Sequence, residues 1–406
     1  MWTRDFSLYF GARAVSLLGD AMMPVAAALA VGRLYGVAGV GYVLAAWTAS
    51  CVLLVVFGGV FADRVGARVM MVGADAVRAV TQGVLAVLFL TGTPPLWLLL
   101  AASVLSGAAT AMFQPGVNGM VPLVARDPQR ANGVLKVADA MTQLAGPVVA
   151  ALLTVAAGAG TVYAVDAVTF VLSALCLALI RRTPAGTAGR SAMGRDLRRG
   201  WVEFRSRTWM WSVILIWICF GLFVFGPYVP LASRLVSEQH GESGFGWTMA
   251  ALGAGTVCGG LIAMRFRPSR PLAAGAVALI GFAAIPLSVA LAPPLPVLMA
   301  GHVLGGAALA FWSVMWSTSV QTQVPPDVLN RVTAYELAGS VSGMAVGQAL
   351  AGPLTEVVAA RDLMLVSAGV SLAVVAALLL VGPIRNQTSA TIRSATRAAP
   401  EPSRIV

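Results

Sequence analysis

A charged turn lies between two long apolar segments at residues 58–68, where the chain reads Gly-Gly-Val-Phe-Ala-Asp-Arg-Val-Gly-Ala-Arg. A degenerate copy, Gly-Gly-Leu-Ile-Ala-Met-Arg, begins 201 residues later at position 259, with Met264 in place of the aspartate. A turn repeated at the same place in each half of a chain predicts two similar membrane bundles. Such duplication is typical of transporters, because the substrate path runs between the halves.

Composition makes the lipid bilayer the solvent of this chain. Hydrophobic residues make up 58% of its 406 residues, charged residues only 11%, and the mean hydropathy is +0.85. Soluble domains carry about 25% charged residues. The apolar runs are longer than the roughly ten-residue alternating strands of a membrane β-barrel, so we predict an all-α membrane protein.

Twelve apolar segments are long enough to be spans of about 20 residues. They lie near residues 8–34, 38–60, 69–92, 95–115, 132–157, 161–180, 209–234, 244–265, 271–291, 295–318, 332–357 and 362–382.

Basic residues indicate the topology of the chain rather than a nucleic-acid surface. The net charge is +11, and we count 24 of the 27 basic residues at helix ends or loops on one side of the membrane. Arg33, Arg234 and Arg361 are the exceptions. The positive-inside rule then places both termini in the cytoplasm. Because 26 of the 27 are arginine, which suggests a GC-rich genome, we expect a multi-pass protein of a bacterial inner membrane.

The composition also predicts four regions. Residues 1–182 form an N-terminal six-helix bundle, 183–208 a cytoplasmic linker, 209–384 a C-terminal six-helix bundle, and 385–406 a disordered cytoplasmic tail. In the linker, Leu197, Trp201 and Phe204 stand at helical spacing among arginines. This pattern leaves two alternatives, an interfacial helix on the anionic inner leaflet and a plain solvated linker.

Signals for enzymatic or metal chemistry are absent from the sequence. The four cysteines lie inside apolar segments without CxxC spacing, and His302 is isolated in its segment. No P-loop, GxSxG or HExxH pattern occurs. We therefore expect no enzyme, no cofactor, no metal site and no nucleic-acid partner.

The turn at 58–68 resembles the signature of the major facilitator superfamily, G-x-L-a-D-R-x-G-R-[RK]. Phe61 replaces the usual Leu, and Ala67 replaces the first of the paired basic residues. The resemblance implies two pseudo-symmetric bundles of six helices, and a cytoplasmic gate at the turn that stabilises the outward-open state. The alternative is that the turn does not move and only stabilises the fold. The predicted gate residues are Gly59, Asp63, Arg64, Gly66 and Arg68.

Two further stretches extend the resemblance. The fifth segment resembles the superfamily's antiporter signature in degenerate form, with Gly146 and Pro147 as a helix-kink motif and Thr or Ala at three glycine places. That match implies export. Residues 13–20 (R-x-x-S-x-x-G-D) and 166–172 (D-A-x-x-F-x-L) resemble the branch that holds the enterobactin exporter and macrolide-efflux proteins.

Ionisable residues inside spans cost about 2.5–3.5 kcal/mol on insertion scales, so each needs a partner or a function. Asp20 lies near the middle of the first segment, and we predict it as proton acceptor, substrate-cation contact, or both. A structural hydrogen bond to a neighbouring helix is the alternative. Glu336 and Asp139 are further candidates for proton coupling, although Lys136 could neutralise Asp139 at i,i+3.

Another i,i+3 pair, Asp75 and Arg78, is expected to brace the cytoplasmic end of the third helix.

In this superfamily the first, fourth, seventh and tenth helices line the central cavity. Aromatic and methionine side chains there suit apolar or cationic organic ligands, and the scarcity of inward arginine argues against strongly anionic ones. Lipid-facing or core packing is the alternative for the aromatic residues. The predicted cavity residues are Asp20, Met23, Trp217, Phe220, Phe223, Trp312 and Trp316.

These observations predict a monomeric secondary active transporter that exports small hydrophobic compounds, neutral or cationic, such as drugs, in exchange for protons. Two alternatives remain. One is an exporter of a single metabolite such as a siderophore. The other is a receptor or scaffold with a transporter fold that moves nothing.

Overall fold

The computed structural model describes residues 2–125, 128–181, 201–202, 204–266, 268–324 and 326–385. Within these ranges the chain forms helices joined by short turns, without a strand. The all-α membrane fold is therefore confirmed. Most of the predicted linker and the tail from residue 386 onward lie outside the described residues.

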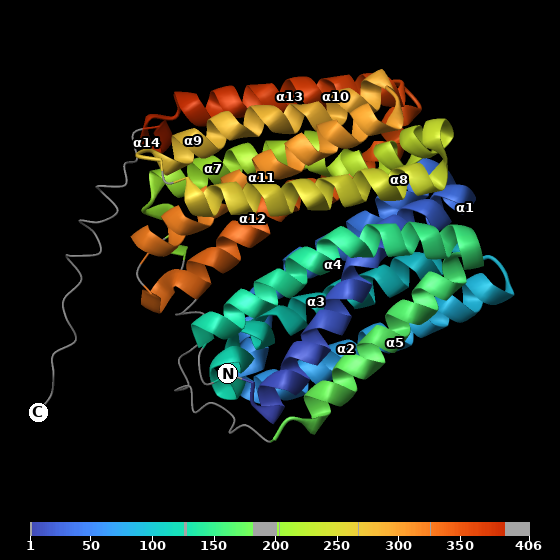
Figure 1. The fold of residues 1–406 in the computed structure, drawn as a ribbon, viewed down its shortest axis with the longest axis vertical. Coiled ribbons are helices and arrows are strands. Elements are labelled where there is room, and N and C mark those ends of the chain that lie inside the picture. The colour runs from blue at the N-terminus through green and yellow to red at the C-terminus, as the bar shows by residue number, and fades with distance from the viewer. Residues whose placement is uncertain are drawn as a thin grey trace, which may run out of the picture.

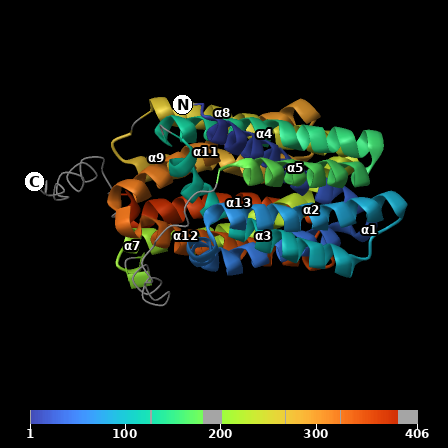
Figure 2. The same cartoon turned by 90° about the horizontal axis from the view of Figure 1, so that it is seen from below.

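Two bundles of long helices make up the molecule (Figure 1). Figure 2 shows the helices of both bundles running along one common direction, as expected for elements that cross the same bilayer. The first bundle consists of α1 (Arg4–Val65), α2 (Ala67–Thr91), α3 (Leu96–Val124), α4 (Pro128–Ala157) and α5 (Ala159–Leu179).

The second bundle begins after the linker. It consists of α7 (Thr208–Phe220), the π-helical turn η1 (Gly221–Phe225), α8 (Gly226–Arg265), α9 (Pro271–Ala278), the 3₁₀ turn η2 (Leu279–Ala283), α10 (Ala284–Leu291), α11 (Leu295–Gln323), α12 (Pro326–Thr355), α13 (Ala360–Leu380) and α14 (Gly382–Arg385).

Nine segments in the described part of the chain are long and apolar enough to cross a membrane. Two of them, Arg4–Val55 and Thr208–Arg265, are far longer than the roughly 20 residues that a bilayer needs. Each contains one non-helical glycine, Gly36 at φ 60° and Gly241 at φ 74°, and glycine adopts such angles without a Cβ penalty. The chain can therefore reverse at both places. The number of twelve spans stays a prediction.

Glycines allow very close packing between α12 and the start of the second bundle. Gly343 and Gly347 lie four residues apart on α12, and a Cβ at these positions would stand 2.1 Å from the Ile218 oxygen and 2.3 Å from the Leu222 oxygen. Small residues at this spacing let membrane helices approach until their backbones touch. This contact holds α7 and η1 against α12, and no motif in the sequence predicts it.

Candidate functional site

A buried charge network around Arg78 is the most polar feature of the first bundle. Arg78 is 2% exposed, and its Nη1 lies 3.3 Å from Oδ1 of Asp20 on α1. Its Nη2 donates to Oδ1 of Asp75, one turn earlier on α2, at 2.5 Å. The rings of Phe113 and Phe170 lie 4.6 and 4.2 Å from its Cζ. Two carboxylates and two ring faces thus surround a charge that would be costly inside a membrane if it were alone.

The network continues to α5. Oγ of Ser173 donates to the second oxygen of Asp75 at 2.6 Å. Asp166, which is fully buried, lies against Gly19, because a Cβ on Gly19 would stand 2.1 Å from its Oδ1. Gly19 and Asp166 belong to the two stretches that indicated the macrolide-efflux branch. The structure therefore brings both stretches to one place.

Charge is not balanced within this network. Asp20 and Asp75 both pair with Arg78, and Asp166 lies beside Gly19, so three carboxyl groups and one guanidinium lie close together here. Burying an uncompensated charge is unfavourable. Arg78 Nε and Asp166 Oδ2 are buried without a hydrogen-bond partner in the described part of the chain. The side chain of Asp20 is 35% exposed, whereas those of Asp75 and Asp166 are inaccessible. Asp20 is therefore the member of the network that is accessible from outside.

Arg78 corrects one expectation from the sequence. The i,i+3 pair with Asp75 is confirmed, but it lies in the interior of α2 and not at the helix end, and Arg78 also reaches Asp20. The signal was present in the sequence, because an arginine inside an apolar segment needs a partner of its own. Periodicity alone did not show which helix would supply that partner.

The predicted aromatic cavity residues of the second bundle lie together. The ring centroid of Trp217 lies 4.8 Å from that of Phe220 and 5.8 Å from that of Trp312. Trp312 stacks on Trp316, with 6.2 Å between their ring centroids. Phe220 and Trp312 are each 1% exposed, and Trp316 is 6% exposed. These rings pack against one another, as the alternative of core packing expects, and their role in a substrate cavity stays a prediction.

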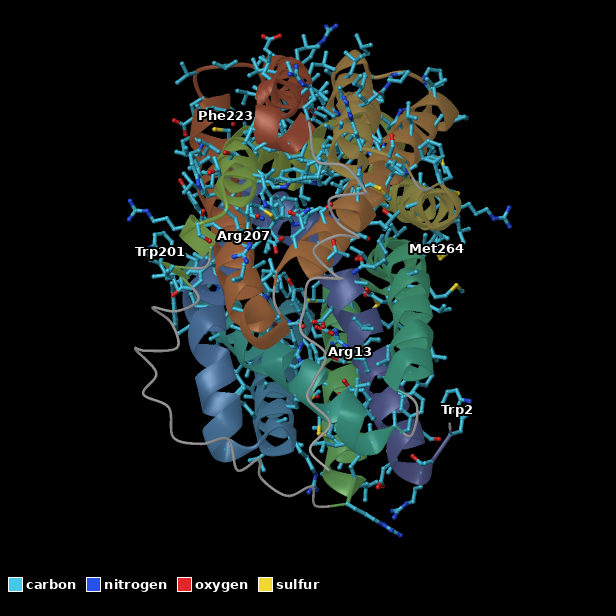
Figure 3. The ribbon with its side chains drawn as sticks, turned by 90° about the vertical axis from the view of Figure 1, so that its left-hand side faces the viewer. Trp2, Arg13, Trp201, Arg207, Phe223 and Met264 are labelled. Atoms are coloured by element: carbon cyan, nitrogen blue, oxygen red, sulfur yellow. The ribbon has the colours of Figure 1, made fainter. Side chains whose placement is uncertain are left out.

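Two other predicted cavity residues lie elsewhere. Phe223 sits on η1, is 47% exposed and makes none of the ring contacts among the described residues (Figure 3). Met23 is half-buried and packs against the core.

Glu336 on α12 accepts a hydrogen bond from the indole nitrogen of Trp316 on α11. This contact joins a proton-coupling candidate to a cavity candidate that the sequence could only place on separate helices. Asp139 is half-buried on α4, and the side chain of Lys136 lies outside the described set. Neither Glu336 nor Asp139 contacts the Arg78 network through a hydrogen bond or ion pair among the described residues.

The predicted cytoplasmic gate is described only in part. The side chains of Asp63 and Arg64 lie outside the described residues, as do the surroundings of Gly59, so the gate role stays a prediction. Gly66 separates α1 from α2 at φ 92°. Arg68 donates from Nε to the Leu177 carbonyl at 2.8 Å and from Nη2 to the Ala178 carbonyl. It therefore caps the C-terminal end of α5, within its own bundle. In the degenerate copy of the turn, Met264 is 64% exposed (Figure 3).

The two bundles touch through α1 and α12. A Cβ on Gly41 would stand 2.2 Å from the Gln348 carbonyl oxygen, and a Cβ on Gly352 would stand 2.2 Å from Cα of Ala38. Arg33 on α1 also forms an ion pair with Glu242 on α8, just after Gly241. The bundles are thus closed against each other at the end that contains Arg33 and Glu242.

The matching contact joins α4 and α8. A Cβ on Gly246 would stand 2.3 Å from Cβ of Ala151, and one on Gly253 would stand 2.8 Å from the Gln143 oxygen. Gln143 and Gln348 head the repeated Gln…Gly-Pro stretches of the two halves, so the internal repeat supplies both contacts. Within the first bundle, Gly146 of the kink motif packs on Ala21 of α1, where a Cβ would stand 2.5 Å from the Ala21 Cβ. Pro147 lies inside α4.

Comparison with known proteins gives relatives over most of the chain. It is 22% identical over 357 residues to macrolide efflux protein A of Streptococcus pyogenes, covering 85% of this chain and 87% of that protein. It is 26% identical over 355 residues to the multidrug efflux pump Tap of Mycobacterium tuberculosis, covering 83% and 84%.

Solved structures share the fold. The nucleoside transporter NupG superposes with a TM-score of 0.70 at 13% identity, over 91% of this chain and 98% of that one. A bacterial homologue of the lysosomal transporter Spinster, solved in an inward-facing and unoccupied conformation, gives 0.69 at 15% identity over 98% of both chains. The family model described as Major Facilitator Superfamily matches residues 9–335. The protein therefore belongs to the Major Facilitator Superfamily.

Proposed function

We propose that this multi-pass membrane protein exports small hydrophobic compounds, neutral or cationic, in exchange for protons. The names of its relatives, which describe macrolide and multidrug efflux, support the export of drugs. The family consists of transporters, so the proposal is movement of a molecule and not its conversion. We place the protein in a bacterial inner membrane as a monomer with both termini in the cytoplasm, because its basic residues gather on one side.

The ion pair between Asp20 and Arg78 is the observation that carries the coupling proposal. Asp20 is the partly exposed member of a network that is otherwise buried, and it shares Arg78 with Asp75. Protonation of Asp20 would remove its charge, and Arg78 would then keep its ion pair with Asp75 alone. Release of that proton would restore the pair. A proton can thus change how α1 is held against α2, and this is the kind of local switch that alternating access needs.

The contacts between the bundles support an inward-facing state. They close the end that contains Arg33 and Glu242, and Arg33 is one of the few basic residues on the predicted outer side. An exporter in this state would take its substrate from the cytoplasm. Glu336, which accepts a hydrogen bond from Trp316, places a carboxylate on the second bundle, and a carboxylate suits an organic cation.

Dye transport in everted membrane vesicles tests the proposal. Ethidium would be supplied with an imposed pH gradient, and wild type would be compared with Asp20→Asn and Asp362→Asn. Asp362 is an exposed carboxylate in the first turn of α13, so it serves as the matched control. We expect gradient-driven transport in wild type and Asp362→Asn, and its loss in Asp20→Asn with the protein still folded.

Other outcomes select an alternative. Transport that survives in Asp20→Asn would remove Asp20 from the coupling step. Absence of any dye transport by folded wild type would contradict broad drug export and favour one dedicated metabolite or a scaffold.

A further inference from the structure

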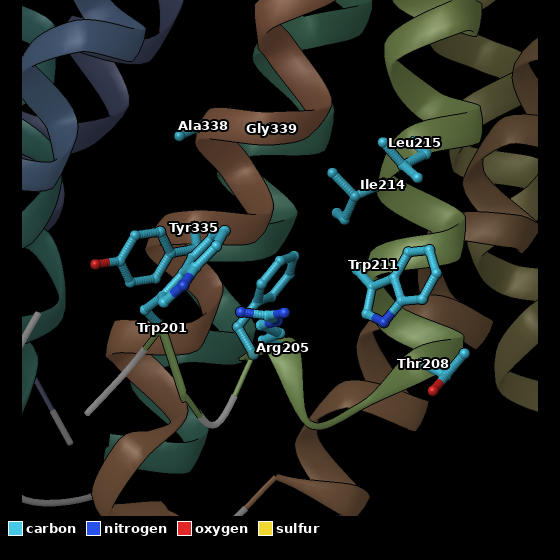
Figure 4. Close-up of a pocket in the computed structure, with 10 residues that line it drawn as sticks. Trp201, Arg205, Thr208, Trp211, Ile214, Leu215, Tyr335, Ala338 and Gly339 are labelled. Atoms are coloured by element: carbon cyan, nitrogen blue, oxygen red, sulfur yellow. The ribbon is translucent and has the colours of Figure 1, made fainter. Parts of the chain in front are cut away.

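A cavity of about 710 Å³ lies at the start of α7, away from the Arg78 network (Figure 4). Its volume is in the range of roughly 300–1,000 Å³ that is usual for small-molecule sites. Residues from three parts of the chain line it: the short helical stretch at the end of the linker, α7, and α12. They are Trp201, Phe204, Arg205, Thr208, Trp211, Ile214, Leu215, Tyr335, Ala338 and Gly339.

The walls of this cavity are aromatic and aliphatic. Trp201 stacks on Phe204 with centroids 5.8 Å apart, and the ring of Tyr335 meets Trp201 edge-on at 5.6 Å. Ile214 and Leu215 form the opposite wall (Figure 4). A surface of this kind excludes water and accepts hydrocarbon.

Arg205 is the sole charged residue of the lining, and Figure 4 shows its guanidinium between the aromatic wall and α7. The side chain is exposed, and no carboxylate pairs with it in the described part of the chain. A guanidinium presents its donors in a planar fork that matches the oxygens of a phosphate group.

The cavity is open to the outside of the molecule beside the start of α7. Trp211 and Leu215 are 38% and 55% exposed near the start of the candidate span Thr208–Arg265, and Trp201, in the short stretch before it, is 48% exposed. Tryptophan gathers at the membrane interface, and basic residues there attract anionic lipids. A hydrocarbon chain and a phosphate would both find their partners in this one cavity.

We propose that the cavity binds an anionic phospholipid of the leaflet at this end of the bundles, with an acyl chain between the aromatic wall and α7 and the phosphate at Arg205. The net charge of +11 favours an anionic ligand. A neutral drug would leave the guanidinium unused.

Native mass spectrometry of the full chain tests this proposal. Protein purified in detergent would be titrated with phosphatidylglycerol and with phosphatidylcholine of identical acyl chains. We expect wild type to prefer phosphatidylglycerol, and Arg205→Gln to reduce that preference about fivefold, the effect of one arginine near a membrane surface. Arg265→Gln, which removes an exposed arginine at the end of α8 outside the cavity, should leave it unchanged.

A second variant probes the apolar wall. Ala338→Phe adds a ring to the α12 side of the cavity and should weaken the binding of both lipids, whereas Arg205→Gln should weaken only the anionic one.

Equal retention of the two lipids by wild type, or an unchanged preference in Arg205→Gln, would overturn the proposal. Displacement of bound phosphatidylglycerol by ethidium, with tighter ethidium binding in Arg205→Gln, would instead identify a drug site. Mass spectrometry measures lipid binding without any transport. A negative result for the lipid proposal can therefore be told apart from a negative result for the export proposal.

Discussion

Gly19 on α1 and Asp166 on α5 lie so close that a Cβ on Gly19 would stand 2.1 Å from the Asp166 carboxylate oxygen. The next residue after Gly19 is Asp20, which pairs with Arg78. The absence of a side chain at position 19 therefore lets α5 approach the charge network. A methyl group there would push Asp166 or α5 away.

Gly19→Ala is expected to destabilise the protein by about 1–3 kcal/mol, the usual cost of overpacking an interior. Gly11→Ala is the matched control on the same helix, because nothing lies within 4 Å of a Cβ at Gly11. Thermal unfolding in detergent, followed by the loss of monodisperse protein, measures both. A Gly19→Ala variant as stable as Gly11→Ala would contradict the packing argument.

Arg78→Gln should be strongly destabilising, because it leaves Asp75 buried without its cation. Breaking one partner of a buried ion pair typically costs about 3–5 kcal/mol. The double variant Arg78→Gln with Asp75→Asn removes both charges and should recover part of that loss. Thermal unfolding of the two variants checks this. If the double variant were no more stable than the single one, the uncompensated Asp75 charge would not be the cause.

Gly41→Leu is expected to separate the bundles at the closed end, because the added side chain would meet the Gln348 backbone. Spin labels would be placed at Thr93 and Pro293, in the loops before α3 and α11. Pulsed electron paramagnetic resonance would then measure the distance between the two labels. We expect a longer distance in Gly41→Leu than in wild type. Gly83→Leu, at a position with open space around its Cβ, is the control. Unchanged distances in Gly41→Leu would show that α1 and α12 do not hold this end closed.

Trp316→Phe keeps an aromatic ring and removes the N–H group that donates a hydrogen bond to Glu336. Loss of a hydrogen bond to a charged group costs about 1.5–3 kcal/mol. In a double-mutant cycle with Glu336→Met, which has no oxygen to accept the hydrogen bond, the two effects should be less than additive, because both variants break the same contact. Full additivity in thermal unfolding would mean that the two residues act independently.

Sequence reasoning predicted the membrane class, the all-helical fold and the family from features that depend on single segments. Apolar length, charge asymmetry and the Gly-x-x-x-Asp-Arg-x-Gly turn need no knowledge of which helices are neighbours. The same reasoning found Asp20 as an unusual intramembrane charge and grouped the aromatic residues of the second half. It could not say that Arg78 is the partner of Asp20, because their contact joins positions 58 residues apart.

Only the tertiary structure decided which side chains meet. The sequence does not distinguish the aromatic residues Trp312, Phe220 and Phe223. In the structure the first two are buried among other rings, whereas Phe223 is exposed on η1. Helical periodicity identifies a face but not the element that covers it. The glycines at 41, 246, 253 and 352 show the same limit, since each became meaningful only where a backbone of the other bundle lay against it. Segment chemistry thus determined that this chain enters a membrane as helices, and helix packing decided which charges and rings form its sites, because packing depends on contacts between residues distant in sequence.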